Sequence, residues 1–279
     1  MPPDDSIDVL MVTHNRPGFT AVALERLLET CDDRMRVWLW HNGDHAETLA
    51  LVRSHLDHPR VAGFHHSRDN TGRRGLWKPT NWLFEQASGA YVSKVDDDCL
   101  MPEGWADVLR TAHADVPELG AIGCWRFRPE DVVPSLARER IQEFGTHRIL
   151  RNCWIEGTGF LMKRSTVEGF GPMRPGTSFP TYCKHLAVAG WLHGWYYPFL
   201  HQEHMDDPRS PYWNLQPERG FRAYRGGRPI WRGSAEAHVW MIRGNALHVQ
   251  RSSLEPTRHV GWRRKVQSAR ARLLLAARA

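Results

Sequence analysis

The first 115 residues alternate between short apolar runs and longer segments in which apolar residues recur every three or four positions. Apolar runs of this length are typical of buried strands, and the spacing in the longer segments is typical of helices. The predicted strands are residues 8–13, 36–40, 61–65 and 90–95. The predicted helices are residues 19–31, 46–56, 77–87 and 104–114. This alternation predicts an α/β fold with a mainly parallel central sheet and helices on both faces.

The pattern is less regular after Pro117. Residues 120–125, 154–162 and 194–200 are predicted strands and residues 181–189 a helix, whereas residues 126–152 are polar and irregular. Residues 201–244 are rich in Pro, Gly, Arg and Trp and have little periodicity. Long loops usually either carry a function or are disordered, and the aromatic residues between Tyr212 and Trp240 favour an ordered binding surface.

Composition narrows the class of protein. The chain has 279 residues, is 41% hydrophobic and carries a net charge of +6 that comes mostly from arginine. Arginine makes bidentate contacts to phosphate, which favours anionic substrates, whereas no motif indicates nucleic acid. No apolar run reaches the roughly 18 residues of a membrane-spanning helix. The acidic N-terminus does not read as a signal peptide, and five scattered cysteines indicate reduced thiols, so we expect a cytoplasmic protein.

Three consecutive carboxylates, Asp96-Asp97-Asp98, end the fourth predicted strand. Asp96 and Asp98 are one residue apart, so both can reach one hard cation that prefers oxygen ligands. Such a cation commonly carries the phosphates of a substrate, which suggests a nucleotide-diphosphate substrate. An acidic turn or a helix N-cap is the alternative reading of the triplet.

Other polar residues follow the earlier predicted strands: His14 and Asn15 follow the first, and His41-Asn42-Gly43-Asp44 the second. Ligands of open α/β sheets bind beyond the carboxyl ends of the strands. These residues and the aspartates are therefore predicted to converge on one site.

With these segments in order, residues 8–205 resemble a GT-A-fold glycosyltransferase of the family 2 type. The D-x-D motif of that family corresponds to Asp96 and Asp98. The other matching segments are Val12-Thr13-His14-Asn15-Arg16-Pro17, Trp40-His41-Asn42-Gly43-Asp44, Asn70-Thr71-Gly72 with Asn81, Glu156-Gly157-Thr158-Gly159-Phe160 with Gly169-Phe170-Gly171, and Trp195-Tyr196-Tyr197-Pro198 with His201 and His204.

The resemblance implies transfer of a sugar from a nucleotide sugar, with a UDP-, GDP- or dTDP-linked donor. It implies that Asp96 and Asp98 hold Mn²⁺ or Mg²⁺, with His204 or His201 as a third ligand, and that Asp97 faces the ribose or the donor sugar. The donor-binding set is Thr13, Asn15, Arg16, His41, Asn42, Asp44, Arg73, Arg74, Lys78, Asp96 and Asp97. For Arg73, Arg74 and Lys78 a solvated basic turn is the alternative.

Two departures from the family pattern affect the chemistry. His41 and Asn42 stand where the family often has an acid that reads the base. The acidic pair of inverting members is missing, because the helix that ends in Ala189-Gly190-Trp191 begins with Ser178-Phe179-Pro180-Thr181. Either the general base lies elsewhere or the enzyme retains configuration. The catalytic candidates are Glu156, Asp97, Glu203 and Asp206.

The resemblance divides the chain into a nucleotide-sugar-binding half (1–115), an acceptor-binding half of the same domain (116–257) and a basic C-terminal helix (258–279). The helix either packs on the domain or contacts an anionic membrane, as a peripheral protein of the inner membrane face would. The acceptor is open between a small natural product and a cell-envelope glycan. A nucleotidyltransferase-type enzyme and a sugar-binding protein without turnover are the alternative functions.

Overall fold

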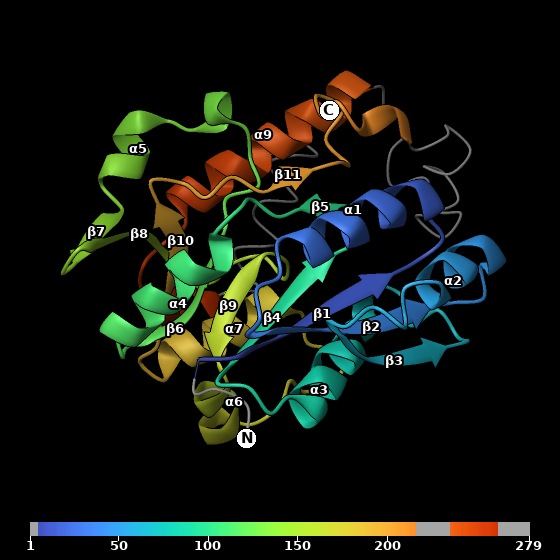
Figure 1. Ribbon diagram of the computed structural model, residues 1–279. Coiled ribbons are helices and arrows are strands. Elements are labelled where there is room, and N and C mark those ends of the chain that lie inside the picture. The colour runs from blue at the N-terminus through green and yellow to red at the C-terminus, as the bar shows by residue number, and fades with distance from the viewer. Residues whose placement is uncertain (1–4, 216–234, 262–279) are drawn as a thin grey trace.

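The computed structural model describes residues 5–215 and 235–261. One nine-stranded sheet runs through the molecule (Figure 1), with strand order β3-β2-β1-β4-β9-β6-β10-β8-β7. Its strands are β1 (Ile7–Thr13), β2 (Met35–Asn42), β3 (Val61–Ser67), β4 (Tyr91–Asp96), β6 (Leu119–Gly123), β7 (Ile141–Phe144), β8 (His147–Asn152), β9 (Phe160–Lys163) and β10 (Leu192–Tyr197). A separate two-stranded sheet pairs β5 (Cys99–Leu100) with β11 (Glu203–His204).

The first half matches the expected strand–helix alternation. Strand β1 pairs in parallel with β2 and with β4, and β2 pairs in parallel with β3. The connecting helices are α1 (Pro17–Glu29), α2 (Ala46–Arg53), α3 (Trp77–Gln86) and α4 (Trp105–Asp115). The predicted α/β fold is confirmed, and the carboxyl ends of these four strands lie along one edge of the sheet.

The second half departs from the sequence prediction. Strand β9 lies antiparallel between β4 and β6, and it begins only at Phe160 because residues 154–159 form a loop. The segment expected to be irregular contains α5 (Pro134–Arg138) and the β7–β8 hairpin, which turns at Gly145 with φ +59°. Short strands of mixed polarity give too weak a period to be recognised.

Helix α9 (Ala235–Arg251) was not predicted, and its first half falls in the segment expected to lack periodicity. The helix buries His238, Ile242, Ala246 and Val249, which recur every three or four residues. One of these buried residues, His238, is polar, which weakens the apolar pattern in the sequence. Residues 216–234 and the predicted tail helix beyond Gly261 lie outside the described residues.

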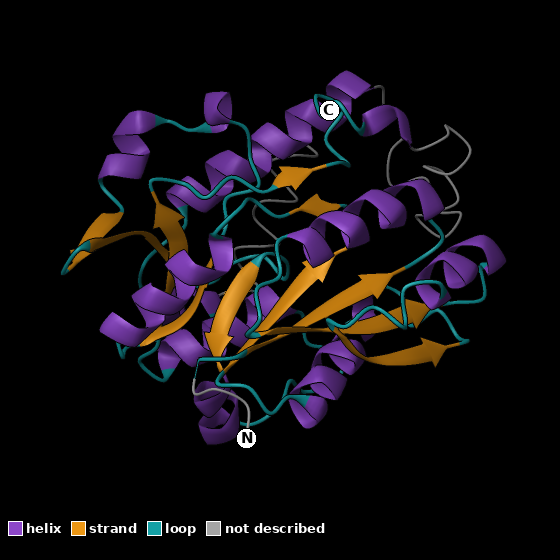
Figure 2. Ribbon diagram, in the orientation of Figure 1, coloured by secondary structure: helices purple, strands orange, loops and turns teal. Residues whose placement is uncertain are grey.

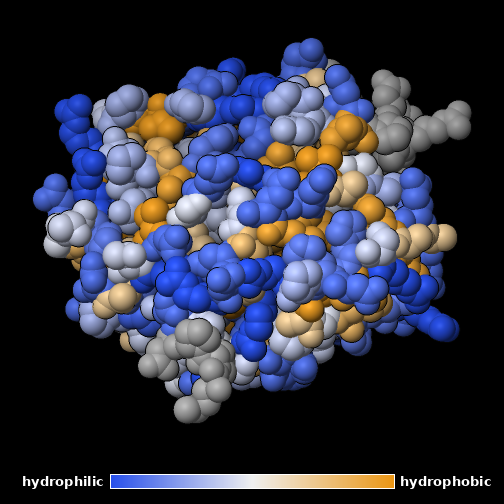
Figure 3. Space-filling view, viewed as in Figure 1, coloured by the Kyte–Doolittle hydropathy of each residue, from blue (hydrophilic) through white to orange (hydrophobic). Residues whose placement is uncertain are grey.

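Helices cover the sheet on both faces (Figure 2). One apolar layer packs under α1, α2 and α4, and the other under α3, α7 (Phe179–Val188) and α9, with α6 (Arg164–Phe170) beside it. The outer face seen in Figure 3 is mainly hydrophilic, with apolar residues in small groups. All five cysteines are free, and within residues 5–215 and 235–261 every helix is too short or too polar to cross a bilayer.

Two histidines, His113 and His193, are fully buried in the core. His113 of α4 hydrogen-bonds the Leu161 carbonyl, and Nδ1 of His193 accepts a hydrogen bond from the amide of Ala121. Burial lowers the pKa of each imidazole from 6.5 to about 3. Protonation of either one therefore opposes the folded state.

We expect acid to destabilise this fold through these two histidines. The unfolded chain binds more protons below pH 6.5, so their contribution is complete above that pH and is lost as the pH falls toward 3. Each histidine should lower the free energy of unfolding by about 1.4 kcal/mol per pH unit in this window. Denaturant titrations between pH 7 and 4.5 measure the slope. His113→Asn and His193→Asn should each flatten it, and an unchanged slope in both would contradict the assignment.

Candidate functional site

A cavity of about 500 Å³ opens at the carboxyl ends of the central strands. Strand ends and the loops that follow them form one side, and α9 forms part of the other. The residues that line it are Val12, His14, Arg16, Asn42, Asn70, Gly72, Leu76, Asp96, Asp97, Asp98, Arg126, Phe127, His204, Asp206, Asp207, His238, Met241, Ile242 and Asn245. The predicted convergence of the first, second and fourth strand ends is therefore present in the structure.

Asp97, the middle residue of the triplet, is held by protein groups. One carboxylate oxygen accepts hydrogen bonds from the backbone amide of His14 (2.9 Å) and the hydroxyl of Thr20 (3.1 Å), and the other binds the guanidinium of Arg16 at 2.5 Å. Only 2% of the residue is exposed, and burial raises its pKa to about 6. These contacts hold Asp97 in place at the cavity wall, and its expected role toward the ribose or the donor sugar stays a prediction.

Arg16 is the cation of the acidic cluster. Its guanidinium also donates to Asp98 at 2.9 Å and lies 3.7 Å from Asp206. Burial raises the pKa of Asp98, but the charges of Arg16 and His204 and the hydrogen bonds from Arg16 and Cys99 together outweigh burial and hold that pKa well below its usual range. Asp98 is therefore an ionised carboxylate at the cavity wall.

Asp96 has a different partner. Its carboxylate binds the ammonium of Lys94, which also donates to the Gly157 carbonyl at 3.0 Å. The Asp96 side chain is 36% exposed and faces the cavity, whereas that of Lys94 is 5% exposed. Asp96 and Asp98 thus lie at the same cavity with separate cationic partners.

One group of three potential metal ligands occurs in the described part of the chain, and it consists of Asp98, Cys99 and His204. Their ligand atoms lie within 4.8 Å of one another, because β5 pairs Cys99 with His204 of β11. Burial raises the pKa of the Cys99 thiol well above its ordinary value, which disfavours the thiolate form that binds metals. An ionised carboxylate and an imidazole remain, and both suit Mn²⁺ or Mg²⁺. Asp96 and His201 are not in this group.

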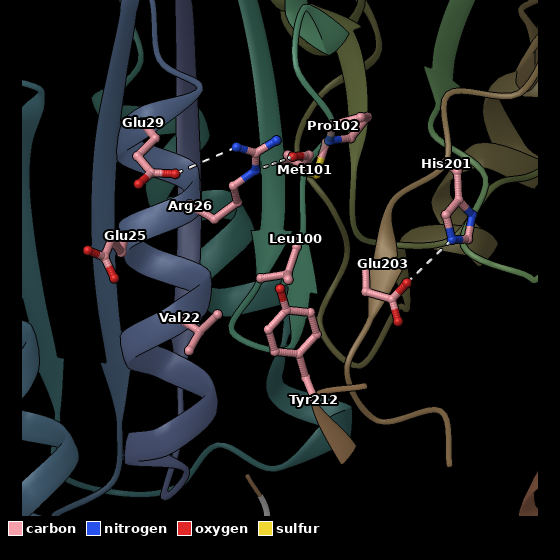
Figure 4. A pocket seen from close by; sticks show the side chains of 10 residues that line it. All are labelled: Val22, Glu25, Arg26, Glu29, Leu100, Met101, Pro102, His201, Glu203 and Tyr212. Carbon is pink, nitrogen blue, oxygen red and sulfur yellow. Dashed lines mark hydrogen bonds and ion pairs between the residues drawn. The ribbon is translucent and has the colours of Figure 1, made fainter. Parts of the chain in front are cut away.

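The alternation of side chains along β11 separates the late candidates. His204 faces the cavity, whereas Glu203 faces a second hollow of about 490 Å³, together with His201, Arg26 and Tyr212 (Figure 4). Glu203 binds Arg128 at 2.7 Å and lies 3.6 Å from His201. The structure therefore does not bring His201 or Glu203 to the acidic triplet, since successive residues of a strand point to opposite sides.

Two other acidic candidates lie near the triplet. Asp206 lines the cavity, and within the described structure its buried Oδ1 makes no hydrogen bond. Glu156 lies on the loop before β9, is half-buried with its carboxylate 3.6 Å from Arg126, and does not line the cavity. Burial raises the pKa of Glu156 despite the nearby arginine.

Thr13 and His41, two of the expected donor-binding residues, are fully buried and absent from the cavity lining, whereas Asn42 lines the cavity. The Thr13 hydroxyl and His41 Nδ1 are 2.9 Å apart. Burial, with the neighbouring His66, lowers the pKa of His41 to about 4. Asn42 accepts from the amide of Thr71 at 2.9 Å, which anchors the loop after β3.

The remaining donor-site candidates are peripheral. Asn15 takes a positive φ of 47°, and Asp44 binds His66 at 3.0 Å with most of its side chain exposed. Arg73 begins a 3-10 helix, Arg73–Gly75, and Arg74 and Lys78 are exposed. Arg74 and Lys78 are absent from the cavity lining.

Sequence reasoning missed several cavity residues. The contribution of α9, from His238, Met241, Ile242 and Asn245, was not expected. Their spacing of three, one and three residues matches one face of a helix, so this pattern was the available signal. Phe127 and Arg126 carried no comparable signal, because they follow β6 in an irregular segment.

Comparisons with known proteins agree with this architecture. The sequence model described as "Glycosyl transferase family 2" matches residues 8–170. No curated protein matches the sequence. A solved structure of the mannosyltransferase PcManGT from Pyrobaculum calidifontis, in complex with GDP-Man and Mn²⁺, is similar with a TM-score of 0.57 and 19% identity, over 96% of this chain and 80% of that one.

A second solved structure, GalNAc-T7 with UDP, GalNAc and Mn²⁺, is similar with a TM-score of 0.55 and 12% identity. The match covers 87% of this chain and 54% of that chain, so this chain spans about half the length of that relative. At these identities the two likenesses show a shared fold.

Replacing Arg16 should destabilise the protein strongly. Arg16→Met leaves Asp97, Asp98 and Asp206 without their shared cation, and breaking a buried ion pair typically costs about 3–5 kcal/mol. Denaturant unfolding without metal measures the loss. The double variant Arg16→Met/Asp97→Asn should recover part of it, because one uncompensated charge is removed. Equal stability of Arg16→Met and the unmodified protein would refute this role of Arg16.

Proposed function

The chain belongs to glycosyl transferase family 2, and from this premise we propose that it moves a sugar from a nucleoside-diphosphate sugar to an acceptor hydroxyl or amine with the help of Mn²⁺ or Mg²⁺. The observation that carries the proposal is the ionised Asp98 beside His204 in a cavity at the carboxyl edge of the sheet. The related structures support it, since both contain Mn²⁺ and a nucleotide or nucleotide sugar.

The charges around the triplet support a divalent cation. Among the described residues, four carboxylates lie together there and two buried cations bind them, which leaves two negative charges within this group. The acids are Asp96, Asp97, Asp98 and Asp206, and the cations are Lys94 and Arg16. A divalent metal would neutralise this remainder, whereas an empty site would keep two like charges close together in a partly buried place.

The metal would be held by Asp98 and His204 together with donor phosphates. When bound, it would stabilise the negative charge that develops on the departing nucleoside diphosphate. The protein groups do the remaining work: Arg16 keeps Asp98 ionised and oriented, and Asp96 presents a carboxylate to the ribose or the sugar. The loop from Asn70 to Gly72, anchored by Asn42, forms the wall of the nucleoside side.

Asp206 is our preferred general base for a reaction with inversion. Asp206 lines the cavity 3.7 Å from Arg16, whereas Glu156 is half-buried beside Arg126 and does not line the cavity. The start of α7 supplies no acid, because its N-cap is Ser178 and its first turn contains no Asp or Glu. If the reaction retains configuration, no such base is needed.

The acceptor would enter on the α9 side of the cavity. Met241 offers apolar surface there and Asn245 an exposed polar group, whereas Phe127, Ile242 and His238 line the same wall as buried side chains. This mixture fits the hydroxyl-bearing and apolar faces of a sugar, as in a cell-envelope glycan or a small glycosylated natural product. The division into donor and acceptor halves at residue 115, the cytoplasmic location and membrane contact by the basic tail belong to the same proposal.

Asp98→Asn and His204→Gln should each lower kcat/KM by about 100-fold or more, because both would remove a metal ligand. A screen of UDP-, GDP- and dTDP-sugars with and without Mn²⁺ identifies the donor, and release of nucleoside diphosphate reports turnover. His201→Gln is the matched control, since His201 lies in the second hollow, and it should keep activity. Release of pyrophosphate would instead indicate a nucleotidyltransferase. Metal-independent binding of a nucleotide sugar without turnover would indicate a sugar-binding protein.

Asp206→Asn should lower kcat by about 10²–10⁴-fold with little change in donor KM, because general-base catalysis contributes about that much. Glu156→Gln, the comparison variant, should lower it far less. Steady-state kinetics with the identified donor and NMR of the product anomer provide the measurement. A larger loss for Glu156→Gln than for Asp206→Asn would reverse the assignment.

A further inference from the structure

Lys94 occupies an unusual place for a lysine. It lies in β4, between β1 and β9 in the centre of the sheet, where its register partners are Leu10 and Phe160. Only 4% of the residue is exposed. An ammonium group in such surroundings is costly unless it is paired and hydrogen-bonded, so its partners indicate its role.

The ammonium of Lys94 joins two segments that lie more than sixty residues apart in the sequence. Side chains two apart in a strand share a face, so Lys94 and Asp96 point the same way, and the ammonium binds the Asp96 carboxylate. It also donates to the carbonyl of Gly157 at 3.0 Å. Lys94 does not line the cavity, whereas Asp96 does.

The same loop is bound to the backbone of β4. The amide of Asp96 donates to the Thr158 hydroxyl at 2.9 Å, and the amide of Gly159 donates to the carbonyl of Lys94 at 2.7 Å. Gly159 has a φ of +61°, and a Cβ there would lie 1.6 Å from the Gln202 side chain. The loop therefore has one tightly packed position against the strand.

We propose that Lys94 is a positioning residue that fixes the Asp96 carboxylate and the loop from Glu156 to Gly159 relative to each other. The inference rests on the proposed function and divides the work of the triplet: Lys94 holds Asp96 for the donor, and Asp98 is left to the metal. One buried cation then sets the distance between the donor side and the loop that precedes β9.

A purely structural role explains this lysine poorly. Well-packed apolar residues often replace buried ion pairs without loss of stability, so a methionine would serve the packing of the sheet. What methionine cannot do is orient the Asp96 carboxylate, because that requires a hydrogen-bond donor behind it. Groups that orient site residues in this way typically contribute about 10- to 100-fold to affinity or activity.

Lys94→Met tests the proposal, with Lys163→Met as the matched control. Lys163 lies on the neighbouring strand β9, and its ammonium binds the carbonyls of Val116 (3.5 Å) and Pro117 (3.2 Å) but no carboxylate of residues 5–215 or 235–261. Amide hydrogen exchange of residues 155–161 in the protein without ligands is the first measurement. Faster exchange in Lys94→Met, and unchanged exchange in Lys163→Met, is expected.

The second measurement is kinetic. Lys94→Met should lower kcat/KM by about 10- to 100-fold with metal affinity nearly unchanged, as read by Mn²⁺ electron paramagnetic resonance, whereas Lys163→Met should match the unmodified enzyme. Asp96→Asn should have a similar effect, and the double variant Lys94→Met/Asp96→Asn should be no worse than either single one. If Lys94→Met does not fold, exchange in Asp96→Asn, which weakens the same contact, decides the question.

Unchanged exchange together with unchanged kinetics in Lys94→Met would overturn the proposal, and so would additive losses in the double variant. Loss of Mn²⁺ binding in Lys94→Met would overturn the division of labour. If the unmodified protein turns over no nucleotide sugar, the proposed function fails. The hydrogen-exchange measurement does not depend on turnover, so it still tests whether Lys94 holds the loop from Glu156 to Gly159.

Discussion

Neutralisation of a cluster of carboxylates at the end of β4 is the constraint on which the site depends. Asp96, Asp97 and Asp98 follow one another in the chain, and Asp206 lies beside them. Arg16 and Lys94 are the buried protein cations that bind them, and each binds a different part of the cluster. Like charges repel strongly where the dielectric constant is low. Each carboxylate of the triplet therefore needs a cation or a hydrogen-bond donor beside it, and this need determines which side chains surround the triplet.

This arrangement gives each aspartate a different environment. Asp97 is buried behind Arg16 and stabilises the turn between β1 and α1 through the amide of His14. Asp98 is kept ionised beside His204, where it suits a metal ion, and Asp96 faces the cavity with Lys94 behind it. Three chemically identical residues thus differ because their partners come from different strands and loops.

The small sheet of β5 and β11 is as important as the large one for this outcome. Its pairing brings His204, Asp206 and Asp207 back to the triplet, whereas the alternation along β11 sends Glu203 to the second hollow. Helix α9 then closes the side opposite the strand ends. This side of the cavity is therefore assembled from segments that follow the region of clear strand–helix alternation.

The sequence alone determined the α/β fold, the resemblance to GT-A glycosyltransferases of family 2, and the edge of the sheet at which the polar residues meet. These follow from local periodicity and from strand ends, which neighbouring residues specify. Three contacts were decided only by the tertiary structure. Arg16 is buried against the triplet and binds Asp98, and His204 rather than His201 lies beside Asp98. The ammonium of Lys94 binds the Asp96 carboxylate. The Arg16 and His204 contacts join residues about 80 and 100 positions apart. The Lys94 contact is local, but the burial that makes it matter comes from strands β1 and β9 on either side, which no local pattern encodes.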